Sequence, residues 1–495
     1  MKSYQEFDMK PNILWICTDQ QRKDTLGCYG NSFVHTPNID GLASCGVRFE
    51  NMYSQSPVCA PSRASFLTGR YPRTCRVRQN GQDIPSEEVT FPKVLSQNGY
   101  VCGLVGKLHI SACHPEVCKF SERRIDDGYS YFKWSHHPAG REDKNNWRGN
   151  EYCTWLADKG LDYLTEPLVE SKYVRAGMPY EYSHTKWCTD RAIEFMEERR
   201  SSDKPWMLSL NYFDPHHSFD PSYEFLEPYL SQIDNLPLPD YIAGELAVKP
   251  CFQLKDSYGA YDTKGYFPFS EMTERDHRLI KAAYFSMCEQ IDFSVGKILS
   301  YLDKSGLRES TLIIYMADHG ESLGDHGIYL KGPYFYDSCV NVPFIFSFPS
   351  KFSGNRVSGA LTELVDIVPT LCEIAEIPCP QGVQGKSFYS LLTEEKEDHR
   401  SSVYSEFYNA NINHRNPFAY CTMVRDKRYK LVKVHPRDKE LSITGELYDL
   451  KNDAGEHENL YGCSSYSEVK LRMLEKLCDR MAQTADPLPQ RKSVW

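Results

Sequence analysis

The sequence predicts an α/β fold in which helices cover both faces of a large, mostly parallel sheet, followed by a smaller C-terminal α+β subdomain. Through the first 385 residues, short apolar runs alternate with longer segments of helical periodicity. Short, nearly continuous apolar runs are typical of strands buried on both faces. Beyond residue 386 strand-like segments follow one another, so a second, smaller sheet is expected there.

The first strand is predicted at residues 12–18, and it ends in the polar sequence Asp-Gln-Gln-Arg at residues 19–22. Open α/β sheets bind ligands at the carboxyl ends of their strands, so these polar groups are candidates for a site. The next element is a helix that begins at Thr36-Pro37, with threonine as the cap and proline in the first turn, and that ends at Gly46.

The remaining elements follow the same alternation. Further strands are expected at residues 100–105, 206–212 and 311–317, and further helices at residues 184–200 and 274–302. Residues 113–182 and 231–269 show little periodicity and are predicted to be irregular insertions.

We expect two domains, at residues 1–385 and 386–495. In the second domain, strand-like segments at 422–434 and 445–450 predict a small antiparallel sheet, and an amphipathic terminal helix is expected near residues 467–481.

The composition excludes several classes of function. There are 57 Lys and Arg residues against 67 Asp and Glu residues, so the net charge is −10, which argues against a nucleic-acid partner. No apolar stretch approaches the length of a membrane span, and residues 1–10 lack the apolar core of a secretory signal. The 18 cysteines are scattered without paired spacing, as is typical of reduced thiols. We therefore expect a cytoplasmic protein.

The most informative segment is residues 56–70. Pro61 favours helical backbone, so Cys59 is expected at or just before a helix N-terminus, where free N–H groups favour an anion. Arg63 lies one turn further along and can return its guanidinium to the same place. Together these residues suit an oxyanion substrate.

The string Cys-x-Pro-Ser-Arg, followed by Ala-Ser-Phe-Leu-Thr-Gly-Arg, resembles the signature of the type I sulfatases in the alkaline phosphatase superfamily. The resemblance extends from residue 11 to about residue 495 and implies an alkaline-phosphatase-like fold. It also implies that a sulfatase-maturing enzyme oxidises Cys59 to formylglycine (3-oxoalanine).

The resemblance implies one divalent metal held by two pairs of residues together with position 59. Asp19 and Gln20 resemble the first pair, although many sulfatases have two aspartates there. Asp318 and His319, directly after the strongest predicted strand, resemble the second pair. Oxygen ligands suit Ca²⁺, whereas an imidazole ligand favours Mn²⁺ or another borderline ion.

Four further residues match motif positions of this family, and three of them, Lys107, His109 and Lys331, resemble residues that contact the sulfate. Lys107 and His109 resemble the Lys-x-His pair, and on an extended segment both would face one pocket. His216 fits the Pro-His-x-Pro-Phe segment, with Ser218 in place of the second proline and with a second histidine, His217, beside it. Lys331 resembles the second sulfate-binding lysine.

The resemblance implies a mechanism. The hydrated aldehyde at Cys59 would attack sulfur while Lys107, Lys331 and Arg63 neutralise the sulfuryl oxygens. His216, with Lys331, would protonate the leaving alcohol, and His109 would accept the proton that lets sulfate depart. The expected substrate is a small organic sulfate, a sulfated sugar first, with aryl and choline sulfates as further candidates.

Three other functions stay open at this point. Gln20 and His319 also fit a phosphonate monoester or phosphodiester hydrolase on the same scaffold. A non-catalytic carbohydrate-binding relative is the second alternative, and an enzyme that uses the unmodified Cys59 thiol is the third.

Three groups of residues have uncertain roles. Asp325 and His326 are expected to be part of the pocket framework rather than a second acid and base. The second group consists of side chains that could stack on a sugar or simply pack the insertion: Trp134, His136, His137 and Trp147. The third group consists of polar side chains that could line the pocket: Arg78, Gln79 and Asn80.

Overall fold

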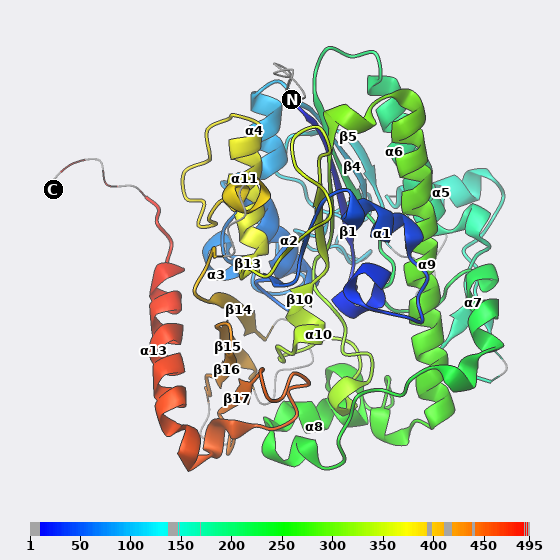
Figure 1. Cartoon of the computed structure of the whole chain (residues 1–495). Helices are drawn as coiled ribbons and strands as arrows, with labels where there is room; N and C mark the ends of the chain where they lie inside the picture. The colour runs from blue at the N-terminus through cyan, green and yellow to red at the C-terminus, as the bar shows by residue number, and fades with distance from the viewer. Residues whose placement is uncertain are drawn as a thin grey trace.

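The computed structural model describes residues 10–489, 491 and 493, except residues 137–146, 148, 169, 394–397, 410–417 and 438–440. Its centre is an eight-stranded sheet with the strand order β12-β2-β11-β9-β1-β8-β4-β5 (Figure 1). The strands are β1 Asn12–Thr18, β2 Val47–Phe49, β4 Val101–Gly106, β5 Tyr129–Trp134, β8 Trp206–Asn211, β9 Thr311–Ala317, β11 Phe344–Ser347 and β12 Arg356–Ser358. Strand β11 runs antiparallel to both of its neighbours, and the other pairs are parallel. The predicted mostly parallel sheet is confirmed.

Helices cover both faces of this sheet (Figure 1). The helices are α1 Pro37–Ser44, α2 Cys59–Thr68, α3 Pro72–Cys75, α4 Phe91–Gln97, α5 Glu151–Asp158, α6 His184–Arg199, α7 Tyr223–Leu230, α8 Cys251–Tyr258, α9 Glu274–Ser305, α10 Asp337–Val340, α11 Ile367–Ile374, α12 Tyr389–Thr393 and α13 Ser467–Gln483. Helices α2, α4 and α11 contribute to the core on one face, and α1, α6 and α9 contribute to the core on the other.

Strand β1 shows why the sheet is buried on both sides. Ile13 and Trp15 point into the first core, whereas Leu14 and Ile16 point into the second. Successive side chains of a strand alternate between its faces, so an uninterrupted apolar run is the pattern that two covered faces require.

The C-terminal part forms a separate antiparallel sheet in the order β14-β15-β16-β17. Its strands are β14 Val403–Tyr408, β15 Tyr420–Arg425, β16 Tyr429–Val434 and β17 Gly445–Asp449. Leu431 and Leu447 of this sheet share a core cluster with Met473 and Leu477 of α13, which lies along the outside of the molecule (Figure 1). The predicted antiparallel sheet and terminal helix are therefore present.

Smaller sheets complete the fold. They are a three-stranded sheet of β3 Met52–Tyr53, β10 Asn341–Val342 and β13 Thr362–Glu363, and a pair formed by β6 Glu166–Pro167 and β7 Arg175–Ala176. Helix α12 packs on the large sheet, since Leu391 and Leu392 belong to the first core cluster.

Three expectations from the sequence were wrong in detail. Residues 113–182 are not an irregular insertion throughout, because they supply the edge strand β5 and the helix α5. Strand β5 is half exposed, and its mixed aromatic and polar sequence therefore lacks a continuous apolar run. The second predicted insertion, residues 231–269, contains helix α8. The segment at residues 422–434 is a hairpin of two strands, which turns where the Asp426 N–H donates to the Tyr429 carbonyl.

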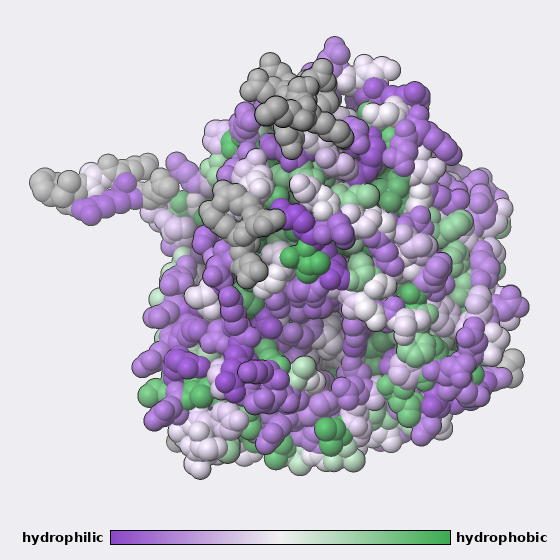
Figure 2. All heavy atoms as spheres, viewed as in Figure 1, coloured by the Kyte–Doolittle hydropathy of each residue, from purple (hydrophilic) through white to green (hydrophobic). Residues whose placement is uncertain are grey.

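The described surface agrees with the composition. Figure 2 shows one face of the molecule, on which hydrophilic side chains predominate and hydrophobic ones are scattered. None of the helices in the described ranges combines the length and the hydropathy that crossing a bilayer requires.

Candidate active site

Four neighbouring strands bring the predicted residues to one edge of the sheet. Strands β9, β1, β8 and β4 are adjacent and mutually parallel, so their carboxyl ends lie together. The predicted residues that follow these strands are Asp318 and His319, Asp19 and Gln20, His216, and Lys107 and His109, respectively. Because Thr18 pairs with Ala317, the two carboxylates that come next in each strand are neighbours.

Cys59 is the first residue of α2, as predicted, and its side chain is buried. Its Sγ lies 2.8 Å from Nζ of Lys331, 3.1 Å from Nε2 of His319 and 3.5 Å from Oδ1 of Asp19. The position predicted for the nucleophile therefore lies among two cationic or basic groups and one carboxylate.

The electrostatic field at Cys59 favours an anion. Burial and the Asp19 carboxylate oppose ionisation of the thiol, but Lys107, Lys331 and His319 outweigh them and lower its pKa to about 6. The same positive charges would stabilise the anionic oxygens of a bound ester.

Asp19, Asp318, His319 and Cys59 form a cluster whose ligand atoms all lie within 4.8 Å of one another. Nδ1 of His319 lies 2.8 Å from the Gly320 carbonyl and donates to it, so Nε2 is the nitrogen that faces the cluster. Two carboxylates and one oriented imidazole suit a divalent cation, so the donor set fits the metal that the sequence predicts.

Arg63 holds these carboxylates in place. Its Nε donates to Oδ2 of Asp318 at 2.8 Å, its Nη2 to Oδ2 of Asp19 at 3.4 Å, and its Nη1 to the Lys107 carbonyl at 3.0 Å. The family resemblance implies that this guanidinium neutralises the sulfuryl oxygens. In the structure all three nitrogens of the fork donate to partners within the protein, so the contacts present here hold the carboxylates.

Gln20 faces the same cluster from an unusual backbone conformation with φ of 63°. Its Oε1 accepts a hydrogen bond from Lys331 at 2.7 Å, and its Nε2 donates to the buried Glu321. Glu321 fixes which end of the amide points toward the site, so the oxygen is the atom offered to a cation or a substrate. Sequence analysis did not select Glu321, although it follows Asp318 by three residues.

Lys331 contacts four side chains of the site. Besides Cys59 and Gln20, its Nζ lies 2.9 Å from Nε2 of His216 and 3.4 Å from Nε2 of His319. The ammonium thus lies between the nucleophile position and the histidine that was predicted to protonate the leaving group.

His216 and His217 both reach the site, whereas the sequence analysis had selected only His216. The two rings stack at a centroid distance of 4.0 Å, and Nδ1 of His217 lies 3.4 Å from Nε2 of Gln20. Burial lowers the pKa of both imidazoles well below the ordinary value, and the neighbouring Lys331 ammonium adds to this effect.

A turn at Gly106 follows strand β4 and leads to Lys107 and His109. Gly106 has φ of 93° and lies so close to the Asn211 carbonyl that an added Cβ would be 2.0 Å from its oxygen, so only glycine fits this turn. Lys107 then forms an ion pair with Asp19. His109 has φ of 53°, so the segment is not extended, and no hydrogen bond joins its ring to Cys59 within the described residues. The predicted extended segment is therefore wrong, whereas the prediction that both side chains face one pocket stays a prediction.

A buried carboxylate, Glu122, shapes the His109 turn. It accepts the backbone N–H groups of His109, Ile110 and Ser111 at 2.6, 2.8 and 3.1 Å and the indole N–H of Trp134 at 2.9 Å. Sequence reasoning missed it because nothing in its local sequence marks it.

The structure places the residues whose roles the sequence left open. Asp325 pairs with Arg22 at 2.7 Å, and His326 contacts Glu245 at 2.9 Å, which agrees with a framework role. Trp134 and Trp147 are buried against each other at a centroid distance of 5.3 Å, so they pack the insertion.

Of the other residues, Asn80 accepts the Ala60 N–H at 3.1 Å, Gln79 donates to the Tyr408 carbonyl at 2.8 Å, and Arg78 is exposed. His137 lies outside the described residues.

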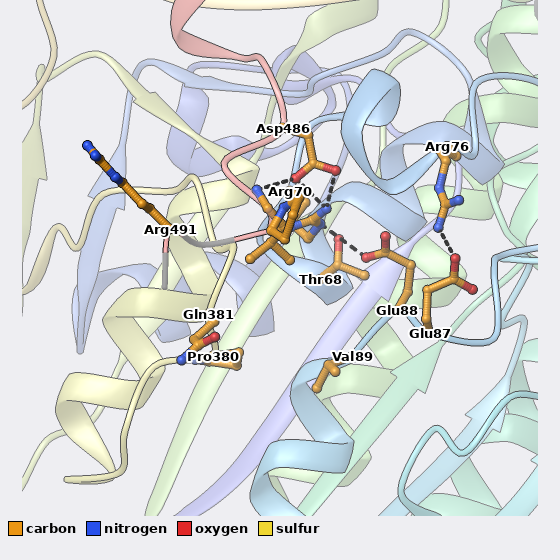
Figure 3. A pocket seen from close by; sticks show the side chains of 12 residues that line it. Thr68, Arg70, Arg76, Glu87, Glu88, Val89, Pro380, Gln381, Asp486 and Arg491 are labelled. Carbon is orange, nitrogen blue, oxygen red and sulfur yellow. Dashed lines mark hydrogen bonds and ion pairs between the residues drawn. The ribbon is translucent and has the colours of Figure 1, made fainter. Parts of the chain in front are cut away.

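A cavity of about 720 Å³ lies at the other end of α2, away from Cys59. Figure 3 shows Arg70 between Asp486 and Glu88, and each ion pair measures 3.1 Å. These contacts tie the chain beyond α13 to the end of α2, and this cavity is separate from the candidate site.

Fold and site together define a hydrolase with an alkaline-phosphatase-like architecture and a centre built for anionic esters. The Sulfatase family model matches residues 11–377, and a model described as N-sulphoglucosamine sulphohydrolase, C-terminal, matches residues 324–483. The chain belongs to the sulfatase family, and the protein is a sulfatase, a sulfuric ester hydrolase.

Similar proteins come from several bacteria. The chain is 30% identical to an arylsulfatase of Clostridium perfringens over 93% of this chain and 92% of the relative. It is 25% identical to an N-acetylglucosamine-6-O-sulfatase of Bacteroides thetaiotaomicron, over 98% of this chain and 88% of the relative. Among solved structures, a phosphonate monoester hydrolase of Agrobacterium radiobacter superimposes with a TM-score of 0.81 at 25% identity, covering 97% of both chains.

Proposed function

We propose that this sulfatase acts on a small sulfated sugar, with formylglycine made from Cys59 as the nucleophile and a divalent metal beside it. The observation that carries the proposal is the environment of Cys59 at the start of α2. Its Sγ is within 3.5 Å of an ammonium, an imidazole and a carboxylate that belong to the predicted site. The hydrated aldehyde supplies a hydroxyl nucleophile, and its second hydroxyl allows sulfate to leave.

The metal would be held by Asp19, Asp318 and His319, with Oε1 of Gln20 as a fourth donor. The ion supplies positive charge beside the sulfuryl oxygens and the nucleophile. The oxygen-rich set favours Ca²⁺, and the imidazole of His319 makes Mn²⁺ the second candidate. Metal analysis of the purified protein, followed by reloading with each ion, distinguishes them.

The chain's own cations would bind and orient the ester. Lys331 reaches both Cys59 and His216, so it can hold a sulfuryl oxygen while the pair delivers a proton to the leaving oxygen. Burial, with Lys107 and Arg63, holds the pKa of His109 well below its ordinary value. A neutral imidazole at neutral pH is suited to accept a proton, which supports the base role proposed for it.

A sulfated sugar is the first candidate substrate because the chain is similar over nearly its whole length to an N-acetylglucosamine-6-O-sulfatase. Aryl and choline sulfates are the next to test. A panel of sulfated monosaccharides, an aryl sulfate and choline sulfate, assayed for sulfate release at one fixed metal concentration, ranks them by kcat/KM.

The decisive experiment is a peptide mass spectrum across Cys59 after co-expression with a sulfatase-maturing enzyme. An aldehyde at this position supports the proposal. A thiol throughout, in protein that still hydrolyses sulfate esters, would overturn the formylglycine mechanism in favour of a thiol-dependent one. A thiol with neither hydrolysis nor metal binding would support the non-catalytic carbohydrate-binding alternative.

Hydrolysis of phosphonate monoesters or phosphodiesters is a second candidate. Gln20 and His319 favour it, and so does the similarity to the Agrobacterium phosphonate monoester hydrolase. An aryl sulfate and the matching aryl phosphonate, compared at the same metal concentration, distinguish the two activities. A higher kcat/KM for the phosphonate would make this the principal activity.

A further inference from the structure

A second cluster of metal-binding side chains lies beside the first one. His109, Cys113 and His136 each offer one ligand atom, and these atoms lie within 4.8 Å of one another. His109 belongs to the turn after β4, and His136 follows β5. These two strands pair in parallel, with Gly106 beside Trp134, so the two histidines leave the sheet at the same edge.

The chemistry of this cluster differs from that of the candidate active site. Two imidazoles and one thiol are the ligands of Zn²⁺ and other borderline or soft ions, whereas Ca²⁺ takes oxygen ligands. Zinc bonds of about 2.0 to 2.3 Å place neighbouring ligand atoms roughly 3.5 Å apart, so small side-chain rotations would close the set around an ion.

An independent observation also points to a ligand here. The His109 side chain is buried, with 7% of its surface exposed, and its Nδ1 has no hydrogen-bond partner within the described residues. A buried nitrogen without a partner is unfavourable, and metal coordination of the ring would remove the penalty.

The backbone that carries both histidines is already held in position. Glu122 accepts the His109 N–H at 2.6 Å and the Trp134 indole at 2.9 Å, and Trp134 lies two residues before His136. One buried carboxylate thus fixes the turn of His109 and the end of β5, which reduces the ordering that an ion would have to impose.

Another cluster, formed by Glu245, His326 and His457, does not carry the same argument. Nζ of Lys249 lies 2.9 Å from the Glu245 carboxylate, so an ammonium already occupies the place of a cation.

We infer that His109, Cys113 and His136 form a second metal site, which takes Zn²⁺ or a similar ion and inhibits the enzyme when it is filled. The thiol proton is released to solvent as the ion binds. Coordination occupies the His109 imidazole and adds positive charge beside it, so the ring can no longer accept a proton. Metal binding at this site does not depend on the proposed function, whereas the inhibition rests on the base role proposed there for His109.

Cobalt binding tests the site directly. Full-length protein is saturated with Ca²⁺, Co²⁺ is added as a spectroscopic probe for Zn²⁺, and the thiolate-to-cobalt charge-transfer absorbance is recorded. We expect the band to persist in Cys59→Ala, to disappear in Cys113→Ser and to persist in Cys118→Ser, a control at a neighbouring buried cysteine. A band that survives in Cys113→Ser, or that is lost in Cys59→Ala, would overturn the assignment.

Inhibition is measured separately on matured enzyme in excess Ca²⁺. The Cys113→Ser variant should keep its activity without zinc, while the Zn²⁺ concentration for half inhibition rises at least about tenfold. Equal sensitivity of the wild type and this variant would refute inhibition through this site. The cobalt band does not require turnover. Absence of sulfatase activity and absence of metal binding at this site are therefore detected separately.

Discussion

Nζ of Lys331 lies 2.8 Å from Sγ of Cys59, at the point where the start of α2 meets the loop that follows β9. The same ammonium contacts His216 and Gln20. One cation therefore connects the nucleophile position, the proposed acid and the side chain that departs from the aspartate pair of many sulfatases. Substitutions in this group of residues should therefore change the catalytic rate measurably.

Replacing Lys331 by methionine should lower kcat/KM about 10²- to 10³-fold, the effect of removing one preorganised group that stabilises developing negative charge. The melting temperature should change little, because methionine has a similar length and removes a buried charge. Lys304→Met, at an exposed position near the end of α9, is the matched control and should retain activity. Full activity of the Lys331→Met enzyme would remove this residue from the mechanism.

Cys59→Ala should abolish hydrolysis and leave the fold intact, because the Sγ contacts polar groups of the site. Cys75→Ala, which removes a thiol from the hydrophobic core, should give the opposite pattern of lower stability and retained turnover. Turnover rates and thermal unfolding of both variants provide the comparison. Wild-type turnover by Cys59→Ala would be incompatible with a nucleophile at position 59.

Asp318→Ala should lose bound metal and activity together. The carboxylate lies beside Asp19 and is held by Arg63 at 2.8 Å, so its removal takes away a ligand and unbalances a buried arginine. Metal content by elemental analysis is the primary measurement, and Asp303→Ala, an exposed position on α9, is the control. Near-normal metal content in Asp318→Ala would contradict the ligand assignment.

The sequence was sufficient for those parts of the site that follow directly from strand ends. Asp19 and Asp318 come immediately after buried apolar runs, and parallel pairing of β1 with β9 makes them neighbours. The position of Cys59 followed from Pro61 and the helix that it begins.

Other parts depend on contacts between distant segments, which no local pattern encodes. The Arg63 guanidinium donates to carboxylates that follow two different strands, and His109 adopts positive φ because Gly106 and Glu122 shape its turn. Strand β5 was not predicted, because this half-exposed edge strand has a sequence that mixes aromatic and polar residues and lacks a continuous apolar run.

Glu321 should act through Gln20. Its carboxylate accepts a hydrogen bond from the Gln20 amide and thereby directs Oε1 toward Lys331. Glu321→Gln removes the preference for this orientation, and groups behind a ligand typically change metal affinity or activity by 10- to 100-fold.

A double-mutant cycle tests this coupling. If the effect passes through the amide, Glu321→Gln should have little further effect on kcat/KM and metal affinity in a Gln20→Ala background. Additive losses in the double variant would show that Glu321 has an independent role.

Glu245 should make stability depend on pH in the acid range. Burial opposes ionisation of this carboxyl, but His326 and Lys249 outweigh it and lower its pKa from 4.5 to about 2. Because the folded-state pKa is depressed, the stabilising contribution is present above about pH 4.5 and is lost as the pH falls toward 2.

Urea unfolding of wild type and Glu245→Gln between about pH 7 and about pH 3 should therefore give a smaller free energy of unfolding for the variant at neutral pH. The two curves should converge on acidification, whereas Glu271→Gln, at an exposed position, should follow the wild type throughout. A constant difference between wild type and Glu245→Gln over this range would mean that packing, and not the charge of Glu245, provides the stabilisation.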